Sequence, residues 1–381
     1  MIISAPLINF SFVPNSKLPV FYLIGLLGFV VVVFISHHIP KESVGLEDVF
    51  FLSFLVCGFI SYKLNANTFP EGRGLTQLVN LALTYVLFKI AWVMMIRSEI
   101  GGRQVLVRIF TINSLLQLAA ILVFAAGLIH GEIFEMVAEM FNNSGNFHIG
   151  AVGVSWNTAR SFGFSPEPSF WSFFIAMNIA LAFVIPKSSR LLLGINFLNL
   201  LLTLGRTGFL MLFVILIVRF SKRSVLTKVF MVFVAVVTTV ILSDYFAIEN
   251  VRSLDISIRQ RVDSILVGLE VFAMNPVFGI GFGNFPVYAA ERELEFFDIF
   301  NLFLNVLVSS GIVGTLLFLC MLAVLFRKIR GEYNLPFYGA MVGWLTVSAY
   351  NLPFAWLMFA ALLYCSARAE DTSDHDLTAP V

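Results

Sequence analysis

Charged residues are scarce in this sequence. Asp, Glu, Lys and Arg make up 12% of the 381 residues, whereas hydrophobic residues make up 59% and phenylalanine alone occurs 42 times. A soluble domain of this size could not cover its surface with so few polar side chains, whereas a lipid bilayer solvates apolar side chains without penalty. The composition therefore excludes an ordinary water-soluble protein and predicts a membrane protein. The formal net charge of +1 says little about partners, and we expect no nucleic-acid partner.

Cysteine is also scarce. Cys57, Cys320 and Cys365 all lie in apolar runs, so they have neither metal-ligand spacing nor the pattern of a disulfide framework. We expect no metal site and no cofactor. The first residues carry no positively charged stretch and are interrupted by Pro14, so no cleavable signal peptide is expected. No repeat of fixed period is present.

Long apolar segments dominate the chain instead. A window of about 20 residues, the length of a transmembrane helix, finds about eleven of them. They are 18–36, 49–62, 75–96, 105–129, 170–186, 191–204, 207–220, 226–243, 301–326, 335–350 and 353–368. Several are shorter than a full span, and such segments can be tilted or re-entrant. The expected fold is an all-α polytopic membrane protein with about eleven transmembrane helices.

Lysine and arginine set the orientation, because they favour cytoplasmic loops. Four basic clusters fit strict alternation of the spans: Arg97/Arg103/Arg108, Lys187/Arg190, Lys222/Arg223/Lys228 and Arg327/Lys328/Arg330. Placing them in the cytoplasm puts the N-terminus outside and leaves two long external loops. Those loops hold most of the unusual polar residues, so function is sought there.

This topology divides the chain into six parts. They are the N-terminal spans (1–129), the first external loop (130–169), the central spans (170–243), the second external loop (244–300), the C-terminal spans (301–368) and an acidic tail (369–381) expected to be disordered.

Arginines on the external face are informative, because the orientation rule disfavours them there. Arg160 lies in the first loop, Arg206 lies in TLGRTGF between two short apolar runs, and Arg259 and Arg261 lie in DISIRQRVDS. Any single one is equally well explained by snorkelling or by a lipid headgroup. Three clusters on one face indicate a site for a multiply anionic ligand, because arginine binds phosphate oxygens bidentately and keeps its charge.

The second loop begins with apolar residues at helical spacing. Val262, Ile265, Leu266, Leu269 and Phe272 predict an amphipathic helix on the membrane surface. Further along, the glycines of GIGFGNF allow two interpretations. They can present N–H groups to a phosphate, or they can let the loop turn tightly after a proline and return to the membrane, which is favoured.

Glu167 stands between two prolines in SFGFSPEPSFWSFF. Pro168 is a natural first residue for the helix that follows. A carboxylate there interacts favourably with the positive end of the helix dipole, which is the structural explanation. The functional explanation is a general base, or a ligand for a sugar hydroxyl, held at the boundary between water and membrane.

Four stretches together carry a family resemblance. RSFGFSPEPSFW resembles the signature around the EPS motif of bacterial O-antigen and capsule polymerases, the Wzy-type enzymes. TLGRTGFLML, RVDSILVGLEVFAMNPVFGIGFGNF and FNLFLNVLVSSGIVGTLLFL resemble the elements that follow it in the O-antigen polymerase/ligase superfamily. The resemblance runs from about residue 160 to 326 in the right order, whereas the first 130 residues match only in being hydrophobic.

The resemblance implies a metal-independent, inverting glycosyltransferase of the multi-spanning C type in the bacterial inner membrane, with its active site facing the periplasm. It would polymerise O-antigen, capsule or exopolysaccharide by transferring a growing glycan from undecaprenyl pyrophosphate to a lipid-linked repeat unit. Arg206 and Arg261 match the pyrophosphate-holding arginines, with Arg160 and Arg259 beside them, and Glu167 matches the acid of the EPS motif. A chain-length regulator is a further expected partner.

The sequence departs from the family pattern at one place. In the ligases of the superfamily and in many polymerases, a histidine precedes the asparagine that opens the span after the second loop, but here Phe300 precedes Asn301. This weakens a ligase interpretation. His148 and Asp298 are further candidates for the base or for sugar contacts, and Asn301 is a further possible site residue. Two alternatives stay open, an O-antigen ligase and a lipid-linked oligosaccharide flippase or other transporter, although transporters tend to show paired halves with broken helices.

Overall fold

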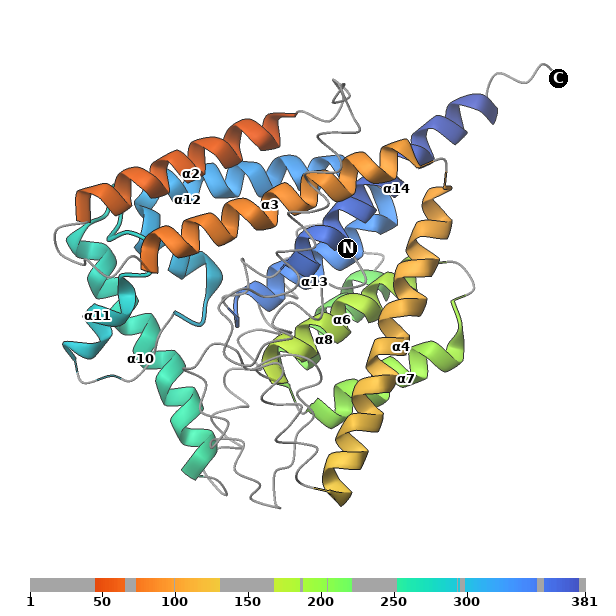
Figure 1. Ribbon diagram of the computed structural model, residues 1–381, viewed down its shortest axis with the longest axis horizontal. Coiled ribbons are helices and arrows are strands. Elements are labelled where there is room, and N and C mark those ends of the chain that lie inside the picture. Colours follow the sequence, from red (N-terminus) through yellow and green to blue (C-terminus); the bar gives the residue numbers. More distant parts are fainter. Residues whose placement is uncertain are drawn as a thin grey trace.

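All the regular elements among the residues that the computed structural model describes are helices (Figure 1). Those residues are 45–65, 73–98, 100–130, 168–185, 188–203, 205–220, 252–292, 294, 299–347 and 353–376. The helices are α2 (Leu46–Asn65), α3 (Arg73–Arg97), α4 (Gly102–Ile129), α6 (Pro168–Val184), α7 (Arg190–Thr203), α8 (Arg206–Phe220), α10 (Arg252–Met274), α11 (Phe285–Ala290), α12 (Leu302–Lys328), the 3₁₀ turn η5 (Gly331–Tyr333), α13 (Asn334–Trp344) and α14 (Pro353–Asp376).

Three helices are long and apolar enough to cross a membrane: Gly74–Arg97, Gly102–Ile129 and Leu302–Lys328. Shorter apolar helices accompany them, so the protein is a multi-pass membrane protein. The predicted apolar segments coincide with helices wherever the structure describes them, although α13 ends at Trp344 and not at 350. The segments 18–36 and 226–243 lie outside the described residues.

The helices α6 and α14 form the centre of the bundle. Every side chain of α14 from Phe354 to Ser366 is buried, and the ring of Trp356 lies 6.1 Å from those of Trp344 and Phe359. Such burial is expected of a helix that is apolar on all sides. Around this centre, α2 packs against α12 and α3, α14 packs against α3 and α4, and α6 packs against α7, α8 and α13 (Figure 1).

The bundle has two chemically different ends. At the first, which we call the basic end, Lys328 Nζ donates to both carboxylate oxygens of Glu47 at 2.6 and 2.8 Å. The end of α14 lies there too, because Ser366 Oγ donates to Lys328 O at 3.1 Å and Tyr364 Oη donates to Ile100 O at 2.5 Å. The basic residues at 97–103 and 327–330, which the alternation predicts on one side of the membrane, therefore gather at the same end of the bundle. The opposite end, where α6, α8 and α12 begin, is called the site end below.

A buried polar cluster joins α4, α6 and α7. Asn178 Nδ2 donates to Asn196 Oδ1 at 2.7 Å, and Asn196 Nδ2 donates to Ser114 Oγ at 2.8 Å. All three side chains are 0% exposed. Side-chain hydrogen bonds of this kind hold helices together where no water reaches. The cluster therefore fixes how α6 and α7 sit on α4, and these helices lead to the positions of Glu167 and Arg206.

The long helix α12 is broken at Gly311, where the backbone has φ 66° and ψ −169°. Residues 275–284 lie across the break and replace its missing hydrogen bonds. The N–H groups of Ile280 and Gly281 donate to Val308 O and Ser309 O at 2.9 and 3.0 Å, and those of Ile312 and Val313 donate to Pro276 O and Val277 O at 2.8 and 3.3 Å. Backbone N–H and C=O groups inside a membrane must find hydrogen-bond partners within the protein. The loop and the broken helix supply these partners to each other.

The glycines of GIGFGNF serve this packing. Gly279 has φ 70°, and a Cβ there would lie 2.4 Å from Val308 O. The N–H groups of Ile280 and Gly281 are already engaged with α12. The tight-turn interpretation is therefore confirmed, and the phosphate-loop interpretation is wrong for these two N–H groups.

The tail differs from expectation in part. The helix α14 continues to Asp376, so it covers the beginning of the segment 369–381 for which composition predicts disorder. Alanine and glutamate at the start of that segment are good helix formers and extend the helix beyond its buried part.

Candidate active site

The site end is formed where the helices α6 and α8 begin side by side. The helix α7 ends at Thr203, and α8 begins at Arg206. Gly208 in the first turn of α8 donates its N–H to Ser172 Oγ of α6 at 3.2 Å. A Cβ at Gly208 would lie 2.7 Å from Ser172 Cβ, so only glycine allows the two helix starts to approach this closely. Arg206 is half-buried at this junction.

Arg261 reaches the same end from the helix α10. It lies on α10, whose inner face packs on α12 through Val267 and Val271. Its guanidinium Nη1 donates to Thr346 O at 2.6 Å, and its Cζ lies 5.0 Å from the centre of the Phe300 ring. A carbonyl oxygen carries no net charge, so this bond orients the guanidinium but does not by itself neutralise it. The ring adds a cation–π contact.

Asn301 caps α12 and binds the end of α13. Its Oδ1 accepts from Leu304 N at 3.0 Å, as an N-cap does, and its Nδ2 donates to Leu345 O at 3.1 Å. The start of α12 is thereby joined to the turn that follows α13. Asn301 thus has a structural role in addition to any contact with a substrate.

The turn at 345–347 brings the predicted residues together. It accepts hydrogen bonds from Arg261 and Asn301, and the hydroxyl oxygen of Thr346 lies 2.9 Å from that of Thr207, the residue after Arg206. The helices α6, α8 and α12 all begin here. Their positive dipole ends and the two guanidinium groups create a region that favours an anion.

The other predicted residues are placed only in part. Arg259 lies on α10, two residues before Arg261, and nothing can be said of its side chain. His148, Arg160, Glu167 and Asp298 lie outside the described residues. The helix α6 begins at Pro168, as predicted, so Glu167 immediately precedes a helix whose first turn contacts α8.

The predicted amphipathic helix is present as α10 (Arg252–Met274). Val262, Leu266 and Leu269 are 48%, 60% and 49% exposed, on the face opposite the packed Val267 and Val271. Both faces are therefore apolar, which fits a helix between protein and lipid; its position at the membrane surface stays a prediction.

An ion pair between Arg292 and Glu270, called the clasp below, holds the segment after α10. Arg292 donates through Nε and Nη2 to the two carboxylate oxygens of Glu270, at 3.2 and 2.5 Å. This hydrogen bonding lowers the pKa of Glu270 and raises that of Arg292. Arg292 also donates to Tyr288 O at 2.9 Å, so the clasp joins α10 to α11.

Some residues at the site end were not predicted. Thr207 stands next to Arg206 in TLGRTGF, so the sequence could have indicated that it lies near the site. Its contact with Thr346 could not be inferred from the sequence. Thr346 lies at the end of an apolar segment and carries no motif. The sequence singles out Phe300 only because it occupies a position where the family often has histidine. In the structure its ring makes a cation–π contact with Arg261.

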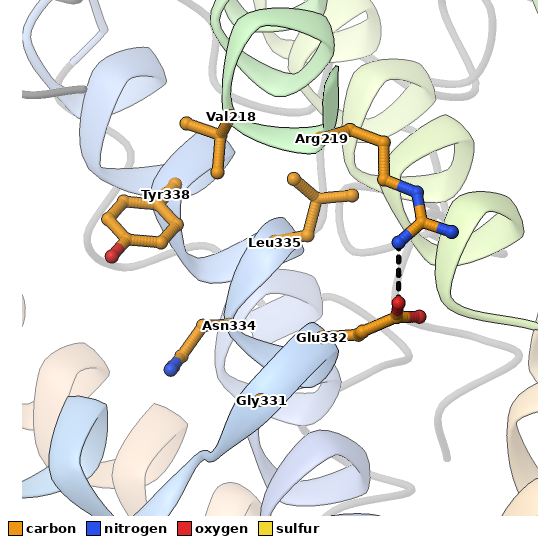
Figure 2. Close-up of a pocket in the computed structure, with 7 residues that line it drawn as sticks. All are labelled: Val218, Arg219, Gly331, Glu332, Asn334, Leu335 and Tyr338. Atoms are coloured by element: carbon orange, nitrogen blue, oxygen red, sulfur yellow. Dashed lines mark hydrogen bonds and ion pairs between the residues drawn. The ribbon is translucent and has the colours of Figure 1, made fainter. Parts of the chain in front are cut away.

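The basic end has a cavity of its own, of about 220 Å³. Figure 2 shows its lining residues, with Arg219 of α8 pointing toward Glu332 of η5. Arg219 Nη1 donates to Glu332 Oε1 at 2.6 Å. Arg206 and Arg219 lie near opposite ends of α8, about 20 Å apart at 1.5 Å per residue. The cavity is therefore separate from the candidate active site.

No group of three or more His, Cys, Asp or Glu side chains that could hold a metal ion occurs among the residues that the structure places. Metal independence stays a prediction for the whole chain, since several acids of the segments 130–169 and 244–300 lie outside that part.

Part of the chain matches a known protein family. Residues 191–319 match the family model Wzy_C, described as O-antigen ligase. The matched range runs from α7 through most of α12, so it includes Arg206, Arg259, Arg261 and Asn301 but neither Glu167 nor Thr346. A search of curated proteins finds no match to the chain.

Proposed function

Because residues 191–319 form a Wzy_C domain, the family shared by Wzy polymerases and O-antigen ligases, we propose that this protein is a bacterial polysaccharide polymerase. Wzy_C members are glycan-transferring enzymes that act on lipid-linked glycans. The specific proposal is transfer of a growing glycan from undecaprenyl pyrophosphate to the terminal sugar of a second lipid-linked repeat unit. The product is O-antigen, capsule or exopolysaccharide.

One observation carries the proposal. Arg261 binds Thr346 through a 2.6 Å hydrogen bond, and Thr346 also contacts the residue that follows Arg206. One turn is thereby bonded to Arg261 itself and to the residue next to Arg206, although the two arginines lie 55 positions apart in the sequence. Guanidinium groups and helix N-termini together suit the multiple charges of a pyrophosphate.

The proposed chemistry is a single displacement. The acceptor hydroxyl oxygen attacks the anomeric carbon of the donor as its proton passes to the Glu167 carboxylate. The bond between the anomeric carbon and the pyrophosphate oxygen breaks, its electron pair stays with the pyrophosphate, and the configuration inverts. Arg206 and Arg261, with Arg160 and Arg259, would stabilise the charge that develops on the leaving group, so no metal ion or other cofactor is needed.

The proposal also covers the number of membrane spans, the orientation of the protein and its protein partner. We propose about eleven spans with the two long segments 130–169 and 244–300 outside, in a fold resembling C-type glycosyltransferases. The site end faces the periplasm of a bacterial inner membrane, where lipid-linked repeat units are polymerised. A chain-length regulator is the protein partner proposed.

A ligase is the second candidate, because the matched family model is described as O-antigen ligase. Ligases of the superfamily have a histidine where this chain has Phe300, which favours the polymerase. A transporter is the third alternative. The candidate polar groups lie at one end of the bundle and not near its middle, which favours an enzyme that works at the membrane surface.

The deciding experiment uses purified protein with lipid-linked repeat units. A ladder of longer glycans supports the polymerase, transfer of a glycan to a lipid A core acceptor without lengthening supports the ligase, and movement across vesicles without any transfer supports the transporter. In this assay Arg206→Ala should abolish the ladder while the protein still inserts in the membrane. Normal ladders from that variant would remove Arg206 from the mechanism.

Glu167 has its own test. Glu167→Gln keeps the shape and hydrogen bonding of the side chain but cannot accept the proton, so the rate should fall far more than the stability. If Glu167 served only as an acid at the start of a helix, the same change would lower the free energy of unfolding by at most about 1 kcal/mol. Glu167→Asp moves the carboxylate by about one bond, and a misplacement of about 1 Å can cost about a hundredfold in rate. If Glu167→Gln extended glycans at nearly the wild-type rate, Glu167 would not be the general base, and His148 and Asp298 would be the next candidates.

A further inference from the structure

Thr207 and Thr346 form a contact that no sequence motif predicts. Their hydroxyl oxygens lie 2.9 Å apart and share a hydrogen bond. Thr207, which follows Arg206 at the start of α8, is 2% exposed. The carbonyl of Thr346 accepts the 2.6 Å hydrogen bond from Arg261. One hydrogen bond therefore joins the backbone that carries Arg206 to the residue that holds Arg261.

Thr346 itself is firmly held. Its N–H and that of Val347 both donate to Gly343 O, each at 3.0 Å. Gly343 lies so close to Phe173 of α6 that a Cβ at this glycine would be 2.4 Å from the ring. The turn is thus anchored on the centre of the bundle, and both the carbonyl and the hydroxyl of Thr346 are fixed points.

We infer that the Thr207–Thr346 hydroxyl pair is a positioning link that sets the spacing between Arg206 and Arg261, so that both guanidinium groups engage one pyrophosphate. The inference rests on the proposed function, because it takes the donor pyrophosphate as the ligand. Both threonines act through the arginines. Two guanidinium groups at a fixed spacing match two phosphoryl groups, whereas a monophosphate offers only one. The link should therefore create a preference for pyrophosphate over monophosphate.

The competing explanation is purely structural: the bond only helps to pack α13 against α8. Valine at either position removes the hydroxyl but keeps the size of the side chain and, at Thr346, the carbonyl that binds Arg261. Loss of packing alone would weaken the binding of both ligands in proportion to the loss of folded protein. Loss of positioning would change the ratio of the two affinities, which a general loss of folded protein leaves unaltered.

The test measures binding by calorimetry, with the full-length protein in detergent and with farnesyl pyrophosphate and farnesyl monophosphate as probes. We expect Thr207→Val and Thr346→Val each to reduce the preference for the pyrophosphate about tenfold, and to lower kcat for glycan extension by at least about tenfold, because small misplacements are costly. The double variant should resemble Thr346→Val, since that single variant already lacks the Thr207–Thr346 bond, together with the 3.0 Å hydrogen bond from Thr346 Oγ1 to Gly343 O. Thr207→Ser and Thr346→Ser should restore both quantities.

Thr84→Val is the matched control. Thr84 is a 0% exposed threonine in α3 whose hydroxyl donates to Asn80 O at 2.8 Å, remote from the site end, and its loss should leave the preference unchanged. If a valine variant accumulates poorly in membranes, Thr346→Cys and Thr207→Cys replace it, because they keep the small side chain with a much weaker hydrogen-bonding group.

Two results would overturn the link: wild-type preference and kcat in both valine variants, or losses that add in the double variant. The arginine variants separate this failure from failure of the proposed function. If Arg206→Ala and Arg261→Ala still bind farnesyl pyrophosphate as the wild type does, the pyrophosphate site is refuted. If they lose that binding while the valine variants keep the preference, only the positioning link is refuted.

Discussion

At the scale of the residue, Arg261 shows why a guanidinium is suited to the site end. One of its N–H groups is bound to Thr346 O at 2.6 Å, and its Cζ lies 5.0 Å from the centre of the Phe300 ring. A planar guanidinium holds several N–H donors in one fixed geometry. An ammonium group has no plane to stack and no second donor at fixed geometry.

We therefore expect Arg261→Lys to lose activity although the charge is kept. Removing one preorganised donor from a site where charge develops costs about 10²–10³ in kcat, and a lysine that keeps the charge should still cost about tenfold or more. The measurement is the rate of glycan extension at equal amounts of purified protein. Arg292→Lys is the control, because Arg292 binds Glu270 and Tyr288 O in the α10–α11 clasp and should tolerate the change. Equal rates for Arg261→Lys and the wild type would reduce Arg261 to a contact with lipid headgroups.

Single residues also show where sequence reasoning stops. The arginines could be singled out because a charge beside an apolar run is unusual. Thr346 could not, since its two partners lie 85 and 139 positions away in the chain and a lone threonine near a helix end is common. Asn301 was named as a site candidate, but its two hydrogen bonds, which cap α12 and bind Leu345 O, arise only from the tertiary packing.

At the scale of the element, the break in α12 predicts a contrast between two glycines. Gly311 has φ 66°, and a Cβ there would lie 2.2 Å from Val277 O. Backbone in this region of positive φ costs a residue with a Cβ of the order of 1–3 kcal/mol, and the overlap adds to it. Gly311→Ala should therefore lower the melting temperature in detergent sharply and reduce the amount of folded protein.

Gly194 of α7 provides the opposite expectation in the same measurement. A Cβ there has nothing within 4 Å, and alanine is favoured over glycine within a helix by roughly 0.5–1 kcal/mol. Gly194→Ala should leave the melting temperature unchanged or raise it. A Gly311→Ala protein as stable as Gly194→Ala would contradict the described pairing of α12 with residues 275–284.

The clasp between α10 and α11 predicts a dependence on pH. Its hydrogen bond from Arg292 holds the pKa of Glu270 below the ordinary value of 4.5. A lowered pKa in the folded state means that the clasp stabilises the fold above that ordinary value and that this contribution is lost as the pH falls through the lowered one. The melting temperatures of the wild type and Glu270→Gln should thus differ near pH 7 and converge in acid. High salt should shrink the difference, because the pair is exposed; a difference that grows in acid would contradict the assignment.

Elements themselves were largely predictable, because apolar runs bounded by charge report membrane spans directly. The end of α13 was not, since apolar residues continue past Trp344 into LTVSAY and hydropathy does not reveal the turn at 345–347. The break in α12 was also hidden. Gly311 lies inside a continuous apolar stretch, and only the loop that packs against it gives this glycine its conformation.

At the scale of the whole molecule, the two ends of the bundle predict which solution each end faces. Lysine and arginine near short loops favour the cytoplasm, so the basic end should face inward and the site end outward. Glu291 and Arg327 are exposed residues near the site end and at the basic end. After replacement of the three native cysteines, Glu291→Cys should react with a membrane-impermeant thiol reagent added to spheroplasts, and Arg327→Cys should react only after permeabilisation. The reverse labelling pattern would place the candidate site in the cytoplasm and exclude a periplasmic polymerase.

The pairing of residues 275–284 with α12 also has a consequence for how the protein is made. These residues leave the ribosome before residues 308–313, which accept and donate their backbone hydrogen bonds. The helix α2, whose Ser61 Oγ donates to Ser309 O at 2.9 Å, is made long before both. A nascent chain that stops between them carries an open backbone edge beside the membrane, where unmet polar groups are costly. The emergence of the first half of α12 from the ribosome is therefore the step at which residues 275–284 find their backbone partners, and chains arrested just before it should be the ones that membrane proteases remove fastest.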